Sequence, residues 1–269
     1  MRMKFTGKSI EDRASGHIKS GTPFLLYGPT GCGKTVAFSS ASESQGRDFE
    51  TIIVSKETTR EDLLGRFFLD SKKGTVFRKG QLLTAIKKNT GVYFDEIQNA
   101  SDDLLSVVYP LLDDRRCLFV DALGGKRFEI SSGFYVGFSG TSLKSLPIAF
   151  RQRVRIIRMD YLPTEEEKNL LLERNPRLKT EDADWLVRIG AVTRGNMESD
   201  SIISTRLLLL LARDLSEENL SREEVALELL TNISGGVIHV ETAIRQKLIV
   251  EGLLEKPVEI PRKRKGCQQ

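Results

Sequence analysis

Short apolar segments alternate with longer amphipathic or polar segments over the first part of the chain, up to about residue 158. The segments expected to form strands are Phe24–Tyr27, Thr51–Val54, Gly91–Phe94, Phe134–Ser139 and Arg155–Met159. Such alternation is typical of a parallel sheet covered by helices. A parallel sheet is buried on both faces, so its strands need not alternate polar and apolar residues. The pattern therefore predicts an α/β fold.

The pattern changes after residues 162–163, where strand signals become rare and leucines recur at helical spacing. The predicted helices are Glu165–Arg174, Glu181–Val192, Ser204–Leu215 and Arg222–Ile233. Thr164 is expected to cap the first of them, because its hydroxyl precedes three acidic residues. We therefore expect an α/β domain over residues 1–160, a small helical domain over residues 161–255, and a basic, disordered tail over residues 256–269.

Two β-hairpins are predicted within the α/β part. The first pairs Arg66–Leu69 with Thr75–Arg78 and interrupts a helix. The second pairs Cys117–Asp121 with Lys126–Ile130. In both, glycines lie between two short apolar segments, which is the usual signal for a turn between antiparallel strands.

A glycine-rich loop follows the first predicted strand. Its residues are Gly28, Pro29, Thr30, Gly31, Cys32, Gly33, Lys34 and Thr35. Between a strand and a helix, this spacing is typical of a loop whose backbone N–H groups surround nucleotide phosphates. Lys34 can reach the β- and γ-phosphates, and the Thr35 hydroxyl can bind Mg²⁺. The loop predicts nucleotide binding; a chance match in a glycine turn is the alternative.

Two adjacent carboxylates end the predicted strand at residues 91–94. Asp95 can be aimed from that strand at a Mg²⁺ ion beside the phosphate loop. Glu96 can polarise an attacking water. The alternative is an ordinary acidic loop after a strand. With the glycine loop upstream, the pair indicates ATP hydrolysis with Mg²⁺.

Four further polar residues are candidates for the same chemistry. Thr141 follows a predicted strand and could hold the water, although turns after strands often contain threonine. Arg151 and Arg153 could form a basic surface or reach a neighbouring subunit's γ-phosphate, which is worth about 10³–10⁵ in rate. Arg206 opens a leucine-rich helix, where the helix dipole does not favour a cation, so it either is simply exposed or has another partner.

Composition excludes some classes of protein. No apolar window approaches the length that spans a membrane. Three separated cysteines and two histidines do not favour a zinc site, and free thiols indicate the cytoplasm. The net charge of +4 is a mild excess, partly in residues 261–265. That basic cluster could contact nucleic acid or an acidic partner, or could be a solvated chain end.

The motifs together resemble a known family. Residues 28–35 (G-P-T-G-C-G-K-T) and 92–96 (V-Y-F-D-E) look like its Walker A and Walker B motifs, and S-T-R at 204–206 looks like its sensor 2 motif. Residues 143–154 are similar to its L-P-x-A-L-x-D-R-F segment, which places Arg153 at the family's arginine. The hairpins look like the helix-2 insert and the pre-sensor 1 hairpin. From about residue 23 to 211, the chain resembles the MoxR branch of AAA+ ATPases, in the CbbQ/NirQ/NorQ and gas-vesicle GvpN group.

This resemblance implies a P-loop (AAA+) α/β domain with a helical lid, working as a homo-oligomeric ring, most often a hexamer, with ATP between subunits. Glu96 would orient water and Thr141 would sense it; Arg153, with Arg151, would complete the neighbouring site; Arg206 would couple the nucleotide to the lid. A von Willebrand factor A-domain partner and a client protein are implied. The family usually has Thr-x-Asn where Ser139 and Thr141 stand, and Asp where Gln152 stands. A nucleic-acid-linked, McrB-like NTPase and a weakly hydrolysing scaffold remain as alternatives.

Overall fold

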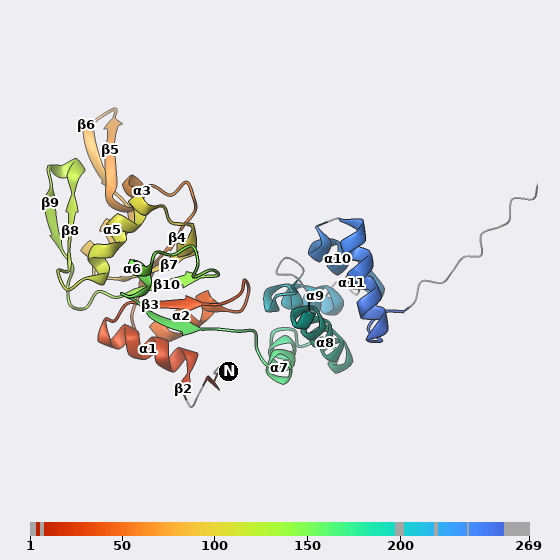
Figure 1. The fold of residues 1–269 in the computed structure, drawn as a ribbon. Helices are drawn as coiled ribbons and strands as arrows, with labels where there is room; N and C mark the ends of the chain where they lie inside the picture. The colour runs from red at the N-terminus through yellow and green to blue at the C-terminus, as the bar shows by residue number, and fades with distance from the viewer. Residues whose placement is uncertain (1–3, 6–7, 197–201, 218–219, 236, 256–269) are drawn as a thin grey trace, which may run out of the picture. The chain divides into compact units, whose positions relative to one another are not determined.

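The structure is a computed structural model that describes residues 4–5, 8–196, 202–217, 220–235 and 237–255 (Figure 1). The chain forms two compact units, which adjoin in sequence between Tyr161 and Leu162. The predicted tail over residues 256–269 lies outside the described residues. Each unit has its own hydrophobic core and is described by itself.

The first unit is built on a five-stranded parallel sheet with the strand order β11-β3-β10-β7-β4. The strands are β3 (Phe24–Tyr27), β4 (Phe49–Ile53), β7 (Gly91–Asp95), β10 (Val136–Gly140) and β11 (Arg155–Arg158). All five predicted strands are confirmed, and no end differs from its prediction by more than two residues. β10 starts later than predicted because Phe134 still belongs to a turn, in which its N–H donates to the Ser131 carbonyl at 3.1 Å.

Helices cover both faces of this sheet. Those of the first unit are α1 (Ile10–Ser20), α2 (Lys34–Glu43), α3 (Arg60–Leu64), α4 (Gln81–Lys88), α5 (Asp102–Leu112) and α6 (Ile148–Arg151). Phe24 and Leu26 of β3 point into a core shared with α1 and α2, whereas Leu25 points into a core shared with α4 and α5. Burial of successive residues on opposite faces explains the unbroken apolar run in this strand.

Both predicted hairpins are confirmed. β5 (Gly65–Asp70) pairs antiparallel with β6 (Gly74–Lys79) between α3 and α4, as the interrupted helix predicted. β8 (Cys117–Val120) pairs antiparallel with β9 (Lys126–Glu129). Figure 1 shows both hairpins projecting from the same end of the first unit. A short two-stranded ladder, β1 (Lys4–Phe5) with β2 (Lys8–Ser9), precedes α1.

The second unit is entirely helical in its described part. Its helices are α7 (Thr164–Arg174), α8 (Thr180–Asn196), α9 (Thr205–Glu217), α10 (Arg222–Ser234) and α11 (Ile238–Val250). The first four match the predicted helices. The prediction that Thr164 caps α7 is wrong: Pro163 takes the extended conformation of the cap, so Thr164 is already the first helical residue. α11 was not predicted, although the spacing of Val240, Ile244 and Leu248 is helical.

Among the helices that the structure describes, none has both the length and the apolar character needed to cross a membrane.

We expect Gly137→Ala to destabilise the first unit. A Cβ atom at Gly137 would lie 2.1 Å from Cε2 of Phe38, a fully buried ring stacked on Tyr93 at a centroid distance of 4.4 Å. Because the ring cannot move into open space, the cost should be about 1–3 kcal/mol of unfolding free energy in urea titrations. Gly16→Ala is the matched control, since its Cβ would meet nothing within 4 Å. A Gly137→Ala protein as stable as the control would contradict this packing.

Candidate functional site

The glycine loop starts at the carboxyl edge of the sheet, between two neighbouring strands. The Gly28 N–H donates to the Gly140 carbonyl of β10 at 3.1 Å, and the Met159 N–H donates to the Tyr27 carbonyl at 2.7 Å. Gly31 and Gly33 have φ values of 71° and 92°, a left-handed conformation that glycine adopts without strain. Alternation of such residues with right-handed ones turns backbone N–H groups into one concavity, which favours an anion.

Helix α2 begins directly after this loop. Gly33 is its N-cap and makes no side-chain capping bond, so the first N–H groups of α2 and the dipole of the helix face the loop. The Lys34 ammonium donates to the carbonyls of Gly28 and Pro29 at 2.9 and 2.8 Å, and only 9% of the residue is exposed. A buried cation is thus held within the concavity of the loop.

Two other loop residues have structural contacts. The Tyr161 hydroxyl donates to the Thr30 carbonyl at 3.0 Å and holds that part of the loop. Cys32 is buried under the loop, and this burial raises the pKa of its thiol although nearby Lys34 acts in the opposite direction. The thiol therefore stays protonated and packs as a small apolar group.

Asp95, at the end of β7, lies between two hydroxyl groups from different elements. Ser139 of β10 donates a short hydrogen bond to the Asp95 carboxylate. Thr35, at the start of α2, donates to the other carboxylate oxygen at 3.4 Å. The Ser139 hydroxyl also accepts the Glu96 N–H at 3.0 Å. One buried serine therefore bonds to both predicted residues, to the carboxylate of Asp95 and to the backbone N–H of Glu96.

Glu96 has a left-handed backbone, with φ of 59°. This conformation is uncommon for a residue with a side chain and is found most often where function requires it. The side-chain amide of Asn99 donates to a Glu96 carboxylate oxygen at 3.2 Å and to the Val54 carbonyl at 3.3 Å. The Glu96 side chain is thereby oriented at the same edge of the sheet.

Thr141 directly follows β10, and its N–H donates to the Gln98 side-chain oxygen at 3.2 Å. Gln98 and Asn99 both belong to a short 3-10 turn, η1 (Ile97–Asn99), next to the carboxylates. These two amides, and Ser139 as an anchor, were not predicted as contributors. For Gln98 and Asn99, the available sequence signal was their position just after the acidic pair.

The buried hydroxyl of Tyr93 lies in the same cluster, close to the hydroxyls of Thr35 and Ser139, but forms no hydrogen bond of good geometry with them. Burial raises the pKa of Tyr93, so the phenol stays neutral. An unsatisfied hydroxyl beside Asp95 leaves hydrogen-bonding capacity for a further polar group. With the oxygen atoms of Thr35 and Asp95, it fits a hard cation such as Mg²⁺, which retains several waters when bound to protein.

Arg153 and Arg151 are held away from this cluster. The Arg153 guanidinium pairs with Asp113, beyond the end of α5, at 3.0 Å and donates to the Ala149 carbonyl at 2.8 Å. Arg151 donates to the Leu146 carbonyl at 3.2 Å. Within the described residues, neither arginine forms a hydrogen bond or ion pair with the glycine loop. The resemblance implies an aspartate beside this arginine, but Gln152 stands there and carries no carboxylate. The carboxylate that pairs with Arg153 comes from Asp113 instead.

Arg206 belongs to the second unit, where it is an exposed residue in the first turn of α9. The start of this helix is fixed by a buried ion pair that was not predicted. The Arg194 guanidinium binds both carboxylate oxygens of Glu167, at 2.7 and 2.9 Å, and Thr205 donates to the same carboxylate at 2.5 Å. Arg194 also donates to the Ile203 carbonyl at 2.9 Å. These bonds tie α7, α8 and the first residue of α9 together.

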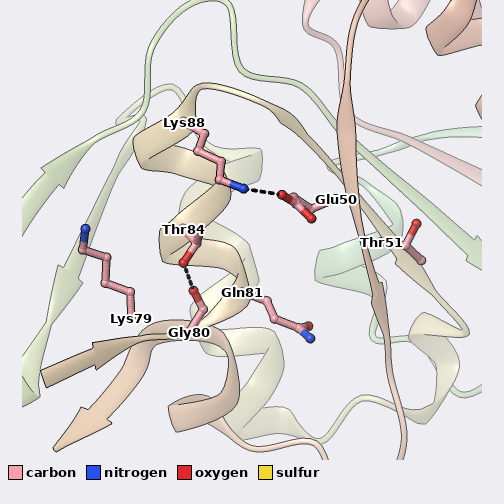
Figure 2. Close-up of a pocket in the computed structure, with 7 residues that line it drawn as sticks. All are labelled: Glu50, Thr51, Lys79, Gly80, Gln81, Thr84 and Lys88. Atoms are coloured by element: carbon pink, nitrogen blue, oxygen red, sulfur yellow. Dashed lines mark hydrogen bonds and ion pairs between the residues drawn. The ribbon is translucent and has the colours of Figure 1, made fainter.

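A hollow of about 270 Å³ lies elsewhere on the first unit, between β4 and the start of α4 (Figure 2). Its lining residues are Glu50, Thr51, Lys79, Gly80, Gln81, Thr84 and Lys88. Lys88 is paired with Glu50 at 2.9 Å, and the Thr84 hydroxyl donates to the Gly80 carbonyl at 2.8 Å. None of the predicted site residues lines this hollow, so it is separate from the loop and carboxylate cluster.

The sequence is similar to known proteins over most of its length. The family model "AAA domain (dynein-related subfamily)" matches residues 23–154. The chain is 32% identical over 200 residues to the denitrification regulatory protein NirQ of Stutzerimonas stutzeri, covering 72% of each chain. It is also 32% identical to NorQ of Paracoccus denitrificans over 198 residues, 71% of this chain and 72% of the relative. For CbbQ of Hydrogenophilus thermoluteolus, identity is 32% over 194 residues, 70% of this chain and 72% of the relative.

Removal of the Glu167 charge should destabilise the second unit. In Glu167→Gln, the Arg194 cation, whose side chain is only 14% exposed, loses the carboxylate that accepts two of its hydrogen bonds, which should cost about 3 kcal/mol of unfolding free energy. Asp184→Asn is the control, because it breaks a less buried pair between α7 and α8, Lys168–Asp184, and should cost at most about 1 kcal/mol. Urea unfolding followed by Trp185 fluorescence measures both. Equal losses in the two variants would show that the buried pair does not hold these helices.

Proposed function

This chain belongs to the MoxR branch of the AAA+ ATPases, and from that premise we propose that it couples Mg²⁺-dependent ATP hydrolysis in a ring of subunits to the remodelling or activation of a client protein. The observation that carries the proposal is the placement of Asp95 between the hydroxyls of Thr35 and Ser139, beside the glycine loop. That arrangement brings the glycine loop, Asp95 and Glu96 to one edge of the sheet, as a site for nucleotide, metal and attacking water would require.

In the proposed site, residues 28–35 bind the phosphates. The backbone N–H groups of the loop surround the oxygens, and the Lys34 ammonium exchanges its carbonyl partners for the β- and γ-phosphates. Thr35 and Asp95 hold Mg²⁺, directly or through water. When bound, the ion would neutralise charge that develops on the phosphate oxygens.

Glu96 acts as the residue that orients and polarises the attacking water. Its carboxylate is steered by Asn99, and its backbone N–H is anchored on Ser139. Thr141 contacts the same water or the γ-phosphate through its hydroxyl, which has a shorter reach than the amide that the family usually carries there. The hydroxyl can still donate a hydrogen bond, so the substitution is compatible with turnover.

We propose a ring because Arg153 and Arg151 are bonded to other groups, and neither forms a hydrogen bond or ion pair with the glycine loop of its own subunit among the described residues. Arg153, assisted by Arg151, would reach the γ-phosphate bound to a neighbouring subunit, in the assembly of six that is common in the family. To make this contact, the Arg153 guanidinium would leave Asp113 and pair with the phosphate. Arg206 would couple the nucleotide to the helical lid, whose α9 start is fixed by the Glu167–Arg194 pair.

We propose that ATP hydrolysis changes the conformation of the ring and that the β5–β6 and β8–β9 hairpins transmit this change to the client. The client lies in the cytoplasm, and a von Willebrand factor A-domain protein takes part as a partner. Two features support the hairpins in this role. They project from the same end of the unit, and they carry exposed apolar side chains. The relatives that bear the names NirQ, NorQ and CbbQ support a chaperone-like activator.

The phosphate-loop and carboxylate roles are separated by two substitutions. Lys34→Ala should abolish binding of a fluorescent ATP analogue, because the loop loses its phosphate-binding cation. Glu96→Gln should keep the affinity but lower steady-state turnover by about 10²-fold or more, because the amide cannot polarise water. Lys56→Ala, at an exposed lysine, is the control and should behave as the unmodified protein. Unchanged ATP affinity in Lys34→Ala would refute the loop assignment.

The proposed contact of Arg153 with the nucleotide of a neighbouring subunit is tested in assemblies that mix two variants. Arg153→Ala alone should lose turnover by about 10³-fold or more. Mixing it with Glu96→Gln subunits should restore activity, because an intact Glu96 site then receives Arg153 from its neighbour. Arg115→Ala is the matched control, since Arg115 pairs with the same Asp113 at 2.6 Å but should leave turnover unchanged. Absence of rescue on mixing would rule out a shared site.

A further inference from the structure

The fold buries the hydroxyl of Tyr93 without a hydrogen bond of good geometry. Tyr93 lies in β7 and is fully buried, and its hydroxyl is among the few buried side-chain groups of the described residues without such a partner. Removal of a hydroxyl from water without a new hydrogen bond opposes folding, and a phenylalanine ring would fill the same space without that cost. A buried group of this kind indicates either an ordered water or a hydrogen bond that forms when a ligand is bound.

The Tyr93 ring has little freedom to carry its hydroxyl elsewhere. Phe38 of α2 stacks on the ring at a centroid distance of 4.4 Å, and Phe49 of β4 meets it edge-on at 6.4 Å. The backbone of Tyr93 is paired on both sides, with Gly137 of β10 and Thr51 of β4. The hydroxyl is therefore fixed in place, and a partner has to approach it.

The place where the hydroxyl is fixed adjoins the candidate metal site. Tyr93 and Asp95 are two residues apart in one strand, so their side chains lie on the same face of the sheet. The Tyr93 hydroxyl is close to the hydroxyls of Ser139 and Thr35. Both of these donate to the Asp95 carboxylate. Three hydroxyl groups, from β7, β10 and α2, therefore adjoin the carboxylate that we propose to bind the metal.

The two hydroxyls beside Tyr93 differ in what they can still accept. A hydroxyl has one proton to donate and two lone pairs that accept. Ser139 uses its proton on Asp95 and one lone pair on the Glu96 N–H. Within the described residues, Thr35 has one hydrogen bond of good geometry, which it donates to Asp95 at 3.4 Å. A bond of that length is weak, so the Thr35 hydroxyl can shift at little cost and has both lone pairs available.

We propose that the Tyr93 hydroxyl is a positioning group of the metal site, which donates a hydrogen bond to the Thr35 hydroxyl when nucleotide and Mg²⁺ are bound. This inference rests on the proposed function, in which Thr35 and Asp95 hold the ion. Thr35 then directs one lone pair at the metal, keeps its proton on Asp95 and accepts the Tyr93 proton with the other lone pair. The bond completes the hydrogen bonding of Tyr93 and fixes the direction of the Thr35 oxygen.

An ordered water bonded to Tyr93 would have a different consequence. Such a water stabilises a protein whether or not nucleotide is bound. Tyr93→Phe would then lower the thermal midpoint measured without nucleotide. A bond that forms only with the metal predicts the opposite, because the substitution removes a desolvated hydroxyl that has no partner under those conditions. The thermal midpoint of Tyr93→Phe without nucleotide therefore separates the two explanations.

The test compares Tyr93→Phe with the unmodified full chain, using a fluorescent ADP analogue as the probe. With Mg²⁺, Tyr93→Phe should bind the analogue about threefold to tenfold more weakly, which is the effect of one lost hydrogen bond. Without Mg²⁺, the two proteins should bind it equally. The thermal midpoint of Tyr93→Phe without nucleotide should be equal to or above that of the unmodified protein.

Tyr135→Phe is the matched control, because it removes the same atom from a tyrosine that stacks on the same Phe38 ring. The Tyr135 hydroxyl donates to the Asp48 carbonyl at 3.0 Å and shares a hydrogen bond with the Ser42 hydroxyl at 3.2 Å. Loss of these bonds should lower the thermal midpoint by about 2–4 °C and leave the nucleotide affinity unchanged. If Tyr93→Phe behaves as this control does, its hydroxyl is merely structural and the inference is overturned.

The same measurement in Ser139→Ala identifies the acceptor of the Tyr93 proton. If Tyr93 donates to Thr35, Tyr93→Phe should weaken binding with Mg²⁺ by the same factor in Ser139→Ala as in the unmodified protein. Loss of that effect in Ser139→Ala would assign the bond to Ser139 and overturn the role given to Thr35.

Failure of this inference can be told apart from failure of the proposed function. Equal affinities of Tyr93→Phe and the unmodified protein with Mg²⁺ would refute the role of Tyr93 alone. Absence of Mg²⁺-dependent nucleotide binding by the unmodified protein would refute the proposed function, and this inference with it.

Discussion

The position of the Asp95 carboxylate depends on the register of three parallel strands. Gly140 of β10 pairs with Tyr27 of β3, and Phe138 of β10 pairs with Phe94 of β7. This register brings the end of each strand to the same edge, where Ser139 can donate to Asp95 and Thr35 can approach from α2. A slip of one residue would turn Ser139 to the other face of the sheet and leave the carboxylate without its buried partner. The geometry of the site is therefore set by the sheet rather than by the loop.

Charged side chains are arranged differently in the two units. In the second unit, Glu167 and Arg194 are withdrawn from solvent but satisfy each other with two hydrogen bonds, so the charges specify how α7, α8 and α9 pack. On the hairpins of the first unit, by contrast, Arg66 and Arg78 are exposed and both lie over one ring, that of Phe68. The buried pair therefore fixes how three helices of the second unit pack, whereas the exposed arginines are screened by solvent.

Much of the fold could be predicted from local signals. Apolar runs identified all five strands of the sheet, and leucine spacing identified four of the five lid helices, because burial imposes these periods directly on the sequence. The glycine loop and the Asp95–Glu96 pair were found because their residue types are adjacent in the chain. Ser139 as an anchor, Asp113 as the partner of Arg153, and the Glu167–Arg194 pair were not found. Each is a contact between residues far apart in sequence, which only the strand order and helix packing bring together. The cap of α7 was assigned to Thr164 because a hydroxyl before three acids is the common signal, whereas the cap residue is Pro163 and the helix starts one residue earlier than predicted.

The central claim is that the Ser139 hydroxyl positions Asp95 and Glu96, the residues that we propose to bind Mg²⁺ and to orient water. The most direct measurement is the Mg²⁺ dependence of ATP turnover in Ser139→Ala, with Ser142→Ala as the control outside the cluster. We predict that Ser139→Ala needs a higher Mg²⁺ concentration for half-maximal turnover and has a maximal rate lower by about tenfold, the effect of losing one hydrogen bond to a charged group. Its affinity for ADP without Mg²⁺ should be unchanged. An unaltered Mg²⁺ dependence and an unaltered maximal rate in Ser139→Ala would contradict the claim.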